Sequence, residues 1–404
     1  MLIQFGIKNM TSFKEETVFS LMAYSRLTRH KESIRDVGKY KVLKSAVLYG
    51  PNASGKSNIF QSLGLFINFI LGKENPEKNH SASIYYPFFL STETNKKPSS
   101  FFIEFYLEDI KSFFRYEISI LEKEIVSESL KQQIGKNELL LFSRKLDCLD
   151  TVNQKYFEEG EKVKTLHALS KEIPLISLSS FLNGFLSQKI LSFFKTIKYL
   201  QMPFIGQRDF TERIKDEGYR SRIEVMLKKA DLGFSKLSYK TTSAPDNHAK
   251  FYVPILEHNV YDSEHKLIEQ KKFSSYLEST GTVGFLHLIP VILETLNKGG
   301  VLVIDELEAS LHPLLVAEII KLFNSHTNVK GQLIFSAHNT SFLSQRLFRK
   351  DQVYFAEKNR YGESSLFSLL DYKDDAREDV NWENRYLAGL YGAIPSLKSL
   401  ERMC

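Results

Sequence analysis

Val47-Leu48-Tyr49-Gly50-Pro51-Asn52-Ala53-Ser54-Gly55-Lys56-Ser57 joins an apolar run to a helical stretch that continues to Ile70. The last eight of these residues follow the pattern G-x-x-x-x-G-K-S, placed between a strand and a helix as that motif requires. The two glycines let the backbone curl so that its N–H groups face phosphates, and the helix N-terminus adds positive potential. The alternative is a glycine-rich turn without a ligand. We expect an ATP-binding loop made of Gly50, Pro51, Asn52, Ala53, Ser54, Gly55, Lys56, Ser57 and Asn58.

A second segment, Gly299 to Glu306, is an apolar run that ends in two acids. Such a run is typical of a strand buried on both faces. Lys56 is expected to bridge the phosphates, and Ser57 to offer its hydroxyl to Mg²⁺ together with a distant carboxylate. Asp305 fits that carboxylate, while Glu306 can polarise the attacking water. The alternative is a helix start at which acids favour the macrodipole.

Two further segments bear on which subclass of phosphate-loop protein this chain resembles. Glu278-Ser279-Thr280-Gly281-Thr282 precedes the apolar strand and opens a helical run, which a plain helix N-cap would also explain. Gln332 to Asn339 forms another apolar strand that ends in His338, a position where a histidine can be purely structural.

The organisation of the chain favours an α/β fold. Residues 1–75 alternate strands with one long helix, period-two alternation from about residue 83 predicts an antiparallel sheet, and residues 160–230 have helical spacing. Short strands are expected between Lys236 and Phe273. After Gly281 the order helix, strand, helix, strand, helix, strand predicts a parallel sheet with crossovers. We therefore expect an ATPase head with an antiparallel β subdomain and an inserted helical lobe, divided as 1–158, 159–233 and 234–404.

Composition places the chain among folded globular proteins. Of its 404 residues 43% are hydrophobic and 25% charged, with 31 Phe and 19 Tyr. Two cysteines exclude a disulfide framework, and the apolar runs are too short or too interrupted to span a bilayer. The first residues lack the regions of a signal peptide, so we expect a cytoplasmic protein without membrane contact.

The net charge of +6 is compatible with an acidic partner. Residues 185–230 hold 10 Lys and Arg against 5 Asp and Glu, which makes this segment the candidate DNA-binding surface. The residues of interest there are Lys195, Lys198, Arg220 and Arg222. A solvated helix face would explain the same pattern.

Three stretches carry a resemblance to a known family. Phe5 to Phe13 (F-G-I-K-N-M-T-S-F) resembles the opening "F-x-x-x-N-F-R-S-F" of the ABC/SMC-like, or RecF-like, AAA ATPases. Asp305 to Pro313 resembles their "D-E-x-x-x-S-L-H-P". Arg385 to Pro395 resembles the C-terminal sequence of bacterial defence ATPases of the RloA and AbiL type, relatives of the PARIS and overcoming-lysogenisation-defect ATPases. Thr11 stands where the family has an arginine.

The resemblance implies a mechanism. Ser279 and Gly281 match the second and fourth positions of the family signature L-S-G-G-Q, from which Glu278 and Thr280 depart. In that family the signature of one subunit contacts the γ-phosphate held by the other, so that ATP joins a homodimer or higher oligomer. His338 matches the histidine that senses the γ-phosphate and orients the catalytic glutamate and water.

The resemblance also implies a role as the sensor or motor subunit of an anti-phage system, controlling an effector nuclease encoded nearby. A RecF-like DNA repair ATPase is the alternative, and a scaffold that turns ATP over slowly is another. A third hypothesis makes the chain itself a nuclease through Asp371, Asp374 and Asp375, which an acidic surface loop also explains. In this family a loop glutamine reports nucleotide to the inserted domain; no glutamine is assigned to that loop here, and the candidates for its position lie around Tyr85 to Phe89.

Overall fold

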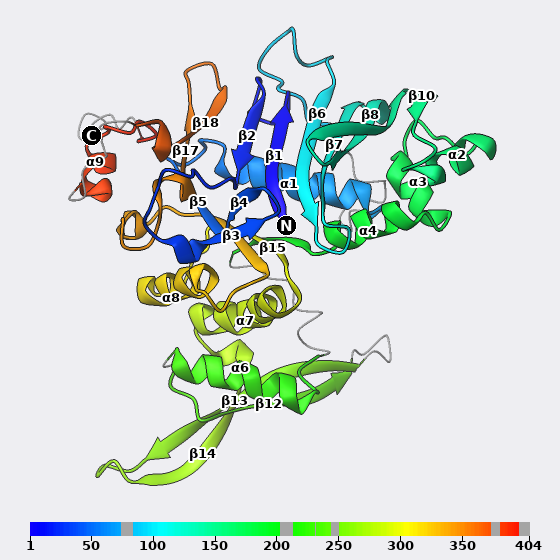
Figure 1. Ribbon diagram of the computed structural model, residues 1–404. Helices are drawn as coiled ribbons and strands as arrows, with labels where there is room; N and C mark the ends of the chain where they lie inside the picture. The colour runs from blue at the N-terminus through cyan, green and yellow to red at the C-terminus, as the bar shows by residue number, and fades with distance from the viewer. Residues whose placement is uncertain (74–83, 203–212, 231, 244–249, 373–379, 396–404) are drawn as a thin grey trace.

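The computed structural model describes residues 1–73, 84–202, 213–230, 232–243, 250–372 and 380–395 (Figure 1). Its central sheet has the order β11-β15-β16-β5-β17-β18. The first five strands are parallel and β18 is antiparallel to β17. Their bounds are β5 Ser45–Tyr49, β11 Ile197–Gln201, β15 Gly300–Asp305, β16 Gly331–Ser336, β17 Val353–Lys358 and β18 Ser364–Ser368.

A seven-stranded antiparallel sheet, of order β10-β9-β8-β7-β6-β1-β2, lies beside the central sheet. Along β7 buried side chains alternate with half-buried ones, as the period-two pattern predicts. Helix α1 (Lys56–Ile70) packs against this sheet, and Phe66 contacts the rings of Phe5 and Phe101. The expected fold class is confirmed. The strands are β1 Leu2–Lys8, β2 Thr17–Ser20, β6 Ser99–Leu107, β7 Ser112–Leu121, β8 Glu124–Ile134, β9 Asn137–Lys145 and β10 Cys148–Val152.

The expected helical lobe 159–233 is interrupted by a strand of the central sheet. β11 pairs in parallel with β15 and forms one edge of the central sheet. The helices before β11 pack beside the antiparallel sheet, whereas α6 contacts α7 and β12. The helical segment is therefore two separate parts. Its helices are α2 Glu158–Thr165, α3 Leu175–Phe181, α4 Phe185–Phe194 and α6 Glu217–Lys229.

The C-terminal part has two of the three expected crossover helices, α7 (Thr280–Lys298) and α8 (Pro313–Asn324). Between β16 and β17 the structure has two 3₁₀ turns, η3 and η4, in place of the third helix. The 3₁₀ turns are η1 Lys31–Ser33, η2 Ser275–Leu277, η3 Thr340–Phe342, η4 Lys350–Gln352 and η5 Leu369–Asp371. The remaining elements are β3 Ile34–Val37, β4 Tyr40–Leu43, β12 Lys236–Ser243, β13 Lys250–Tyr261, β14 Leu267–Ser274 and α9 Trp382–Leu387.

The expected short strands between Lys236 and Phe273 are therefore present, as the three-stranded sheet β12-β13-β14. A helix suited to crossing a bilayer is not found in the described residues.

A buried ion pair ties α3 to the antiparallel sheet. Arg144 Nε donates to Glu128 Oε2 at 2.7 Å, and both side chains are fully buried. The Glu128 carboxylate also accepts the Tyr116 hydroxyl at 2.8 Å and the N–H of Leu175, the first residue of α3, at 2.9 Å. Because every partner is satisfied, the pair holds the helix in place at a low net cost of desolvation.

Glu128→Gln should destabilise the protein by about 3–5 kcal/mol, because it leaves the Arg144 guanidinium buried without a counter-charge. Denaturant unfolding measures this loss. Glu124→Gln, at the exposed start of the same strand, is the matched control and should change stability by less than about 1 kcal/mol. Equal losses in the two variants would contradict the assignment.

Candidate functional site

The candidate site lies where three neighbouring parallel strands end at one edge of the central sheet. β15, β16 and β5 are adjacent and run in the same direction. Each is followed by one of the segments singled out in the sequence: Asp305 and Glu306 after β15, His338 after β16, and Gly50 to Ser57 after β5. Ligands of open α/β sheets bind at this carboxyl edge.

The two loop glycines are required by both conformation and space. Gly50 has φ 151° and Gly55 has φ 110°. A Cβ at Gly50 would lie 2.3 Å from the Ala356 carbonyl oxygen, and one at Gly55 would lie 2.6 Å from Ser364 Oγ. Side chains are therefore excluded, and the loop can curl tightly before α1 begins at Lys56.

The loop is also held from outside by serines that the sequence analysis passed over. Ser364 Oγ donates to the Ser54 carbonyl at 2.7 Å and lies 2.8 Å from Ser12 Oγ, whose hydroxyl can donate to it, while Asn58 Nδ2 donates to Ser12 Oγ at 2.7 Å. Ser12 belongs to the motif Phe5 to Phe13, and that motif was the only sequence feature that pointed to its contact with the loop. Next to it, Thr11 N–H donates to the Tyr86 carbonyl at 2.6 Å, which places the Tyr85–Phe89 segment beside this motif.

Lys56 folds back over the loop. Its Nζ donates to the carbonyls of Gly50 at 2.7 Å and Pro51 at 3.0 Å, and the side chain is buried. Burial lowers the pKa of Lys56 to about 8, against the opposing effect of Asp305, Glu306 and Glu308. The lysine predicted after β5 and the acids predicted after β15 therefore lie within electrostatic reach. Ser57, the second residue of α1, is half-buried beside it.

Asp305 is held by Ser336, which the sequence analysis also missed. Ser336 Oγ donates to Asp305 Oδ1 at 2.5 Å and accepts the Glu306 N–H at 2.8 Å. Asp305 is 1% exposed, and its Oδ2 has no hydrogen-bond partner among the described residues. A buried carboxylate oxygen of this kind needs a ligand, and a hydrated Mg²⁺ next to Ser57 fits its chemistry.

Glu306 and His338 face each other across the strand ends. His338 Nε2 lies 3.5 Å from Glu306 Oε1, and both side chains remain partly exposed, at 37% and 45%. Glu306 has φ 57°, a left-handed conformation that is unusual for a glutamate. Strain of this kind is found at functional sites.

Glu308 is a further residue that the sequence analysis overlooked. Its Oε1 accepts the backbone N–H of His338, and that of Asn339 at 3.2 Å, so it anchors the turn that carries the histidine. Its position two residues after Glu306 was the sequence feature that could have indicated a role in the site. Together with burial, this carboxylate raises the pKa of Tyr49, the last residue of β5.

The signature segment stands apart from the loop. Ser279 is the exposed N-cap of α7, and its Oγ accepts the Thr282 N–H at 3.1 Å. Gly281 packs against the 308–311 turn, since a Cβ there would lie 2.4 Å from the Ser310 carbonyl oxygen. Within the described residues, no hydrogen bond joins Ser279 to the loop. The structure therefore gathers every predicted site residue except Ser279 and Gly281.

The segment expected to bind DNA is spread over several elements of the structure. Lys195 and Lys198 lie at the end of α4 and on β11, and Lys198 pairs with Glu294 at 2.7 Å. Arg220 and Arg222 lie on α6 and bond to nearby carbonyls. The four residues thus come from three elements, and Lys195 and Lys198 line one hollow together with Arg213 and with Tyr219 of α6.

The acidic cluster proposed for a nuclease falls partly outside the described residues, where Asp374 and Asp375 lie. Asp371 caps its own turn by accepting the Ser368 N–H. In the parts of the chain that the structure describes, three or more His, Cys, Asp or Glu side chains nowhere gather as a metal site.

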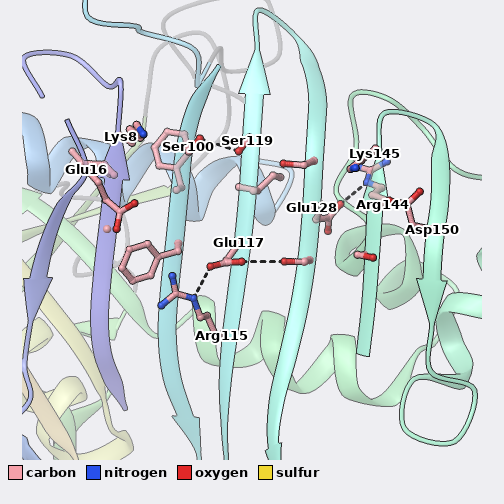
Figure 2. A pocket seen from close by; sticks show the side chains of 18 residues that line it. Lys8, Glu16, Ser100, Arg115, Glu117, Ser119, Glu128, Arg144, Lys145 and Asp150 are labelled. Atoms are coloured by element: carbon pink, nitrogen blue, oxygen red, sulfur yellow. Dashed lines mark hydrogen bonds and ion pairs between the residues drawn. The ribbon is translucent and has the colours of Figure 1, made fainter. Parts of the chain in front are cut away.

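A hollow of about 480 Å³ opens on the antiparallel sheet, away from the predicted residues (Figure 2). Polar pairs line it, including Ser100 of β6 with Ser119 of β7 at 2.9 Å and, within β7, Arg115 with Glu117 at 2.6 Å. Their groups satisfy one another, so this hollow is not the candidate site.

Binding of ATP should take up a proton above pH 8. Lys56 of the nucleotide-free protein has a pKa of about 8, and a phosphate beside it would raise that value. At a pH between these two pKa values, the complex therefore holds more protons than the nucleotide-free protein. Affinity should therefore fall up to about tenfold per pH unit above 8. Calorimetry at pH 9 in two buffers of different ionisation enthalpy measures the uptake, and its absence would contradict the assignment.

Glu308→Ala should lower kcat about tenfold while leaving the KM for ATP nearly unchanged, because it frees the His338 turn without touching the loop. Steady-state ATP hydrolysis separates the two constants. Glu318→Ala, on the exposed face of α8, is the control and should behave as the unmodified protein. A rise in KM alone would show that Glu308 does not position the histidine.

Comparison with known proteins gives matches to a family and to solved structures. A family model described as "AAA domain, putative AbiEii toxin, Type IV TA system" matches residues 45–344. A search of curated proteins found no significant match. Similar solved structures include the SMC head domain from Thermotoga maritima, which is 13% identical, with 91% of this chain and 98% of that chain covered and a TM-score of 0.40.

Two further solved structures are also similar. An Smc head with an extended coiled coil, bound to a ScpA domain derived from Pyrococcus furiosus, is 11% identical, with 91% and 96% covered and a TM-score of 0.45. An Smc head bound to the C-winged helix domain of ScpA is 12% identical, with 91% and 97% covered and a TM-score of 0.45. Because the family model spans well over half of the 404 residues, the chain belongs to the family of AAA domains described as "AAA domain, putative AbiEii toxin, Type IV TA system".

Proposed function

We propose that this protein is a Mg²⁺-dependent ATPase that closes around ATP as a dimer. The observation that carries the proposal is the gathering of Lys56, Asp305, Glu306 and His338 at one sheet edge, from segments up to 282 residues apart. Each type of side chain suits a separate part of phosphoryl transfer, which needs phosphate binding, charge neutralisation and an oriented water.

The phosphates would lie in the loop Gly50 to Ser57, where Lys56 would exchange its two loop carbonyls for phosphate oxygens. Ser57 and Asp305 would hold Mg²⁺, which neutralises charge on the phosphates. The support for this is the buried, unpartnered Asp305 Oδ2. Ser336 keeps that carboxylate aimed by occupying its other oxygen.

Glu306 would take a proton from the attacking water, and His338 would orient both the glutamate and the γ-phosphate. Their separation of 3.5 Å and their partial exposure support these roles, because a water and a phosphate oxygen can still enter between them. Glu308 would act indirectly, as a positioning residue for His338.

Dimerisation is proposed because one chain leaves its own site open on the signature side. Ser279 is exposed at the N-terminus of the 19-residue helix α7 and is not bonded to its own loop. A helix N-terminus favours anions, so Ser279 can contact the γ-phosphate held by a second copy. Gly281 allows the close packing that sets the start of this helix.

The biological role that we propose is the sensor or regulatory subunit of a bacterial anti-phage system, which controls a partner effector nuclease. Its supports are the resemblance to defence ATPases and the family description, which names an AbiEii toxin. A RecF-like DNA-binding ATPase is the alternative, and its support is the hollow lined by Lys195, Lys198 and Arg213. Steeply salt-dependent DNA binding would favour that alternative over a protein partner.

Glu306→Gln should bind ATP without hydrolysing it and should accumulate as an ATP-stabilised dimer or larger assembly, because the closed state can no longer decay. Light scattering during size-exclusion chromatography, with and without ATP and Mg²⁺, measures the change. Turnover of the unmodified protein should exceed that of Glu306→Gln at least about hundredfold.

Adding Ser279→Arg to Glu306→Gln should abolish the ATP-dependent increase in mass, while each chain still binds ATP. The reason is that the bulky arginine lies only at the proposed contact between the two copies. Leu166→Arg, at an exposed position just after α2, serves as the control for a surface arginine. The same mass for Glu306→Gln with and without ATP would overturn the dimer mechanism.

A further inference from the structure

The three-stranded sheet β12-β13-β14 forms an arm at the lower edge of the molecule in Figure 1. β14 pairs with β13 alone among the described strands, so its outer edge has free backbone groups. Its residues Leu267 to Phe273 are exposed on both faces. An open edge of this length is a template for pairing with another strand.

The arm also exposes apolar side chains, and their exposure to water does not stabilise a monomer. Tyr261, Leu267 and Ile268 are 54%, 52% and 62% exposed, and they cluster where the arm ends. β12 pairs with β13 only as far as Glu257, so beyond that residue the arm is a two-stranded ribbon. Such ribbons are marginally stable in water, and further strands stabilise them.

We infer that β14 pairs antiparallel with β14 of a second copy of this chain, about a two-fold axis at Gln270. In this register Glu269 lies opposite Lys271 of the second copy, and Lys271 lies opposite its Glu269. Leu267 lies opposite Phe273, which is itself 36% exposed. The pairs 269–271 and 267–273 are thus complementary in charge and in apolar character, while Ile268 lies opposite Lys272.

The charges select this register over its neighbours. A two-fold axis perpendicular to the sheet requires one residue to face its own copy, because side chains alternate between faces. An axis at Lys271 would bring two lysines together, and an axis at Glu269 would bring two glutamates together. Gln270 is neutral, so the register centred on it avoids the like-charge pair at the axis that either adjacent register would create.

The same charges explain why the partner is a second copy. Lysines on an open edge usually prevent association with other strands. Here Lys271 needs a strand that places an acid opposite it, and a second copy of this chain supplies that acid through its own Glu269. Within one copy the Glu269–Lys271 pair spans 3.3 Å at 52% and 59% exposure, so both side chains are free to turn outward.

This contact is separate from the proposed ATP-dependent one and goes beyond it. It contains no group of the nucleotide site, so the pairing should form without ATP. Sedimentation velocity of the nucleotide-free protein should show a dimer. Glu269→Lys or Lys271→Glu should each raise its dissociation constant about tenfold or more, because each places two like-charge pairs across the axis.

Charge exchange then gives the decisive measurement. The double variant Glu269→Lys, Lys271→Glu restores complementarity and should dimerise as the unmodified protein does. The two single variants should form a mixed dimer with each other, since one carries two lysines and the other two glutamates at the facing positions. ATP binding by every variant verifies that it is folded.

A nucleotide-free monomer, or single variants that dimerise as tightly as the unmodified protein, would overturn the inference. Failure of the double variant or of the mixture to associate would do the same. Assembly of Glu306→Gln with ATP is measured in parallel in the arm variants. Its loss in every background would count against the proposed function alone, and its persistence in the arm variants would show that the two contacts are distinct.

Discussion

The parallel alignment of β15, β16 and β5 is the constraint on which the rest of the structure depends. Parallel strands end at the same edge, so the loops that follow them must meet. This alignment brings the loop lysine near acids that lie some 250 residues further along the chain. Crossover helices cover the faces of the sheet, and they account for the uninterrupted apolar runs of its strands.

The edge is shaped by small side chains as much as by charged ones. Glycines admit the tight loop turn, Ser12 and Ser364 hold that loop from outside, and Ser336 aims Asp305. Each serine provides a short, directed hydrogen bond where a larger side chain would fill the space intended for phosphate. The charged groups are therefore positioned before any ligand arrives, which is what electrostatic catalysis requires.

The two proposed contact surfaces, the signature segment and the arm, are connected by one short segment of chain. Ser279 at the start of α7 and the open strand β14 are joined by the 3₁₀ turn Ser275–Leu277. An ion pair of 2.8 Å between His258 and Glu278 couples the arm to the signature segment. The proposed nucleotide contact and the proposed arm contact would each join two copies. Two different two-fold contacts on one chain build an assembly larger than a pair.

The sequence by itself determined the fold class and most of the site, since the loop, the acids and the histidine are each identified by neighbouring residues and strand or helix patterns. Helix and strand periods are local, which is why the antiparallel sheet and two of three crossover helices were predicted correctly. Segment 197–201 was assigned to a helical lobe, because its membership of the central sheet depends on pairing with the distant β15.

Only the tertiary structure decided which groups hold the site in place. Glu308, Ser336, Ser12 and Ser364 act through hydrogen bonds that join residues 30 to 352 positions apart in the chain. The open edge of β14 likewise follows from strand order. Hydrogen bonds between distant segments depend on the folded geometry, whereas a motif depends only on its neighbours. For that reason the sequence named the candidate site residues, and the fold supplied the groups that hold them in place.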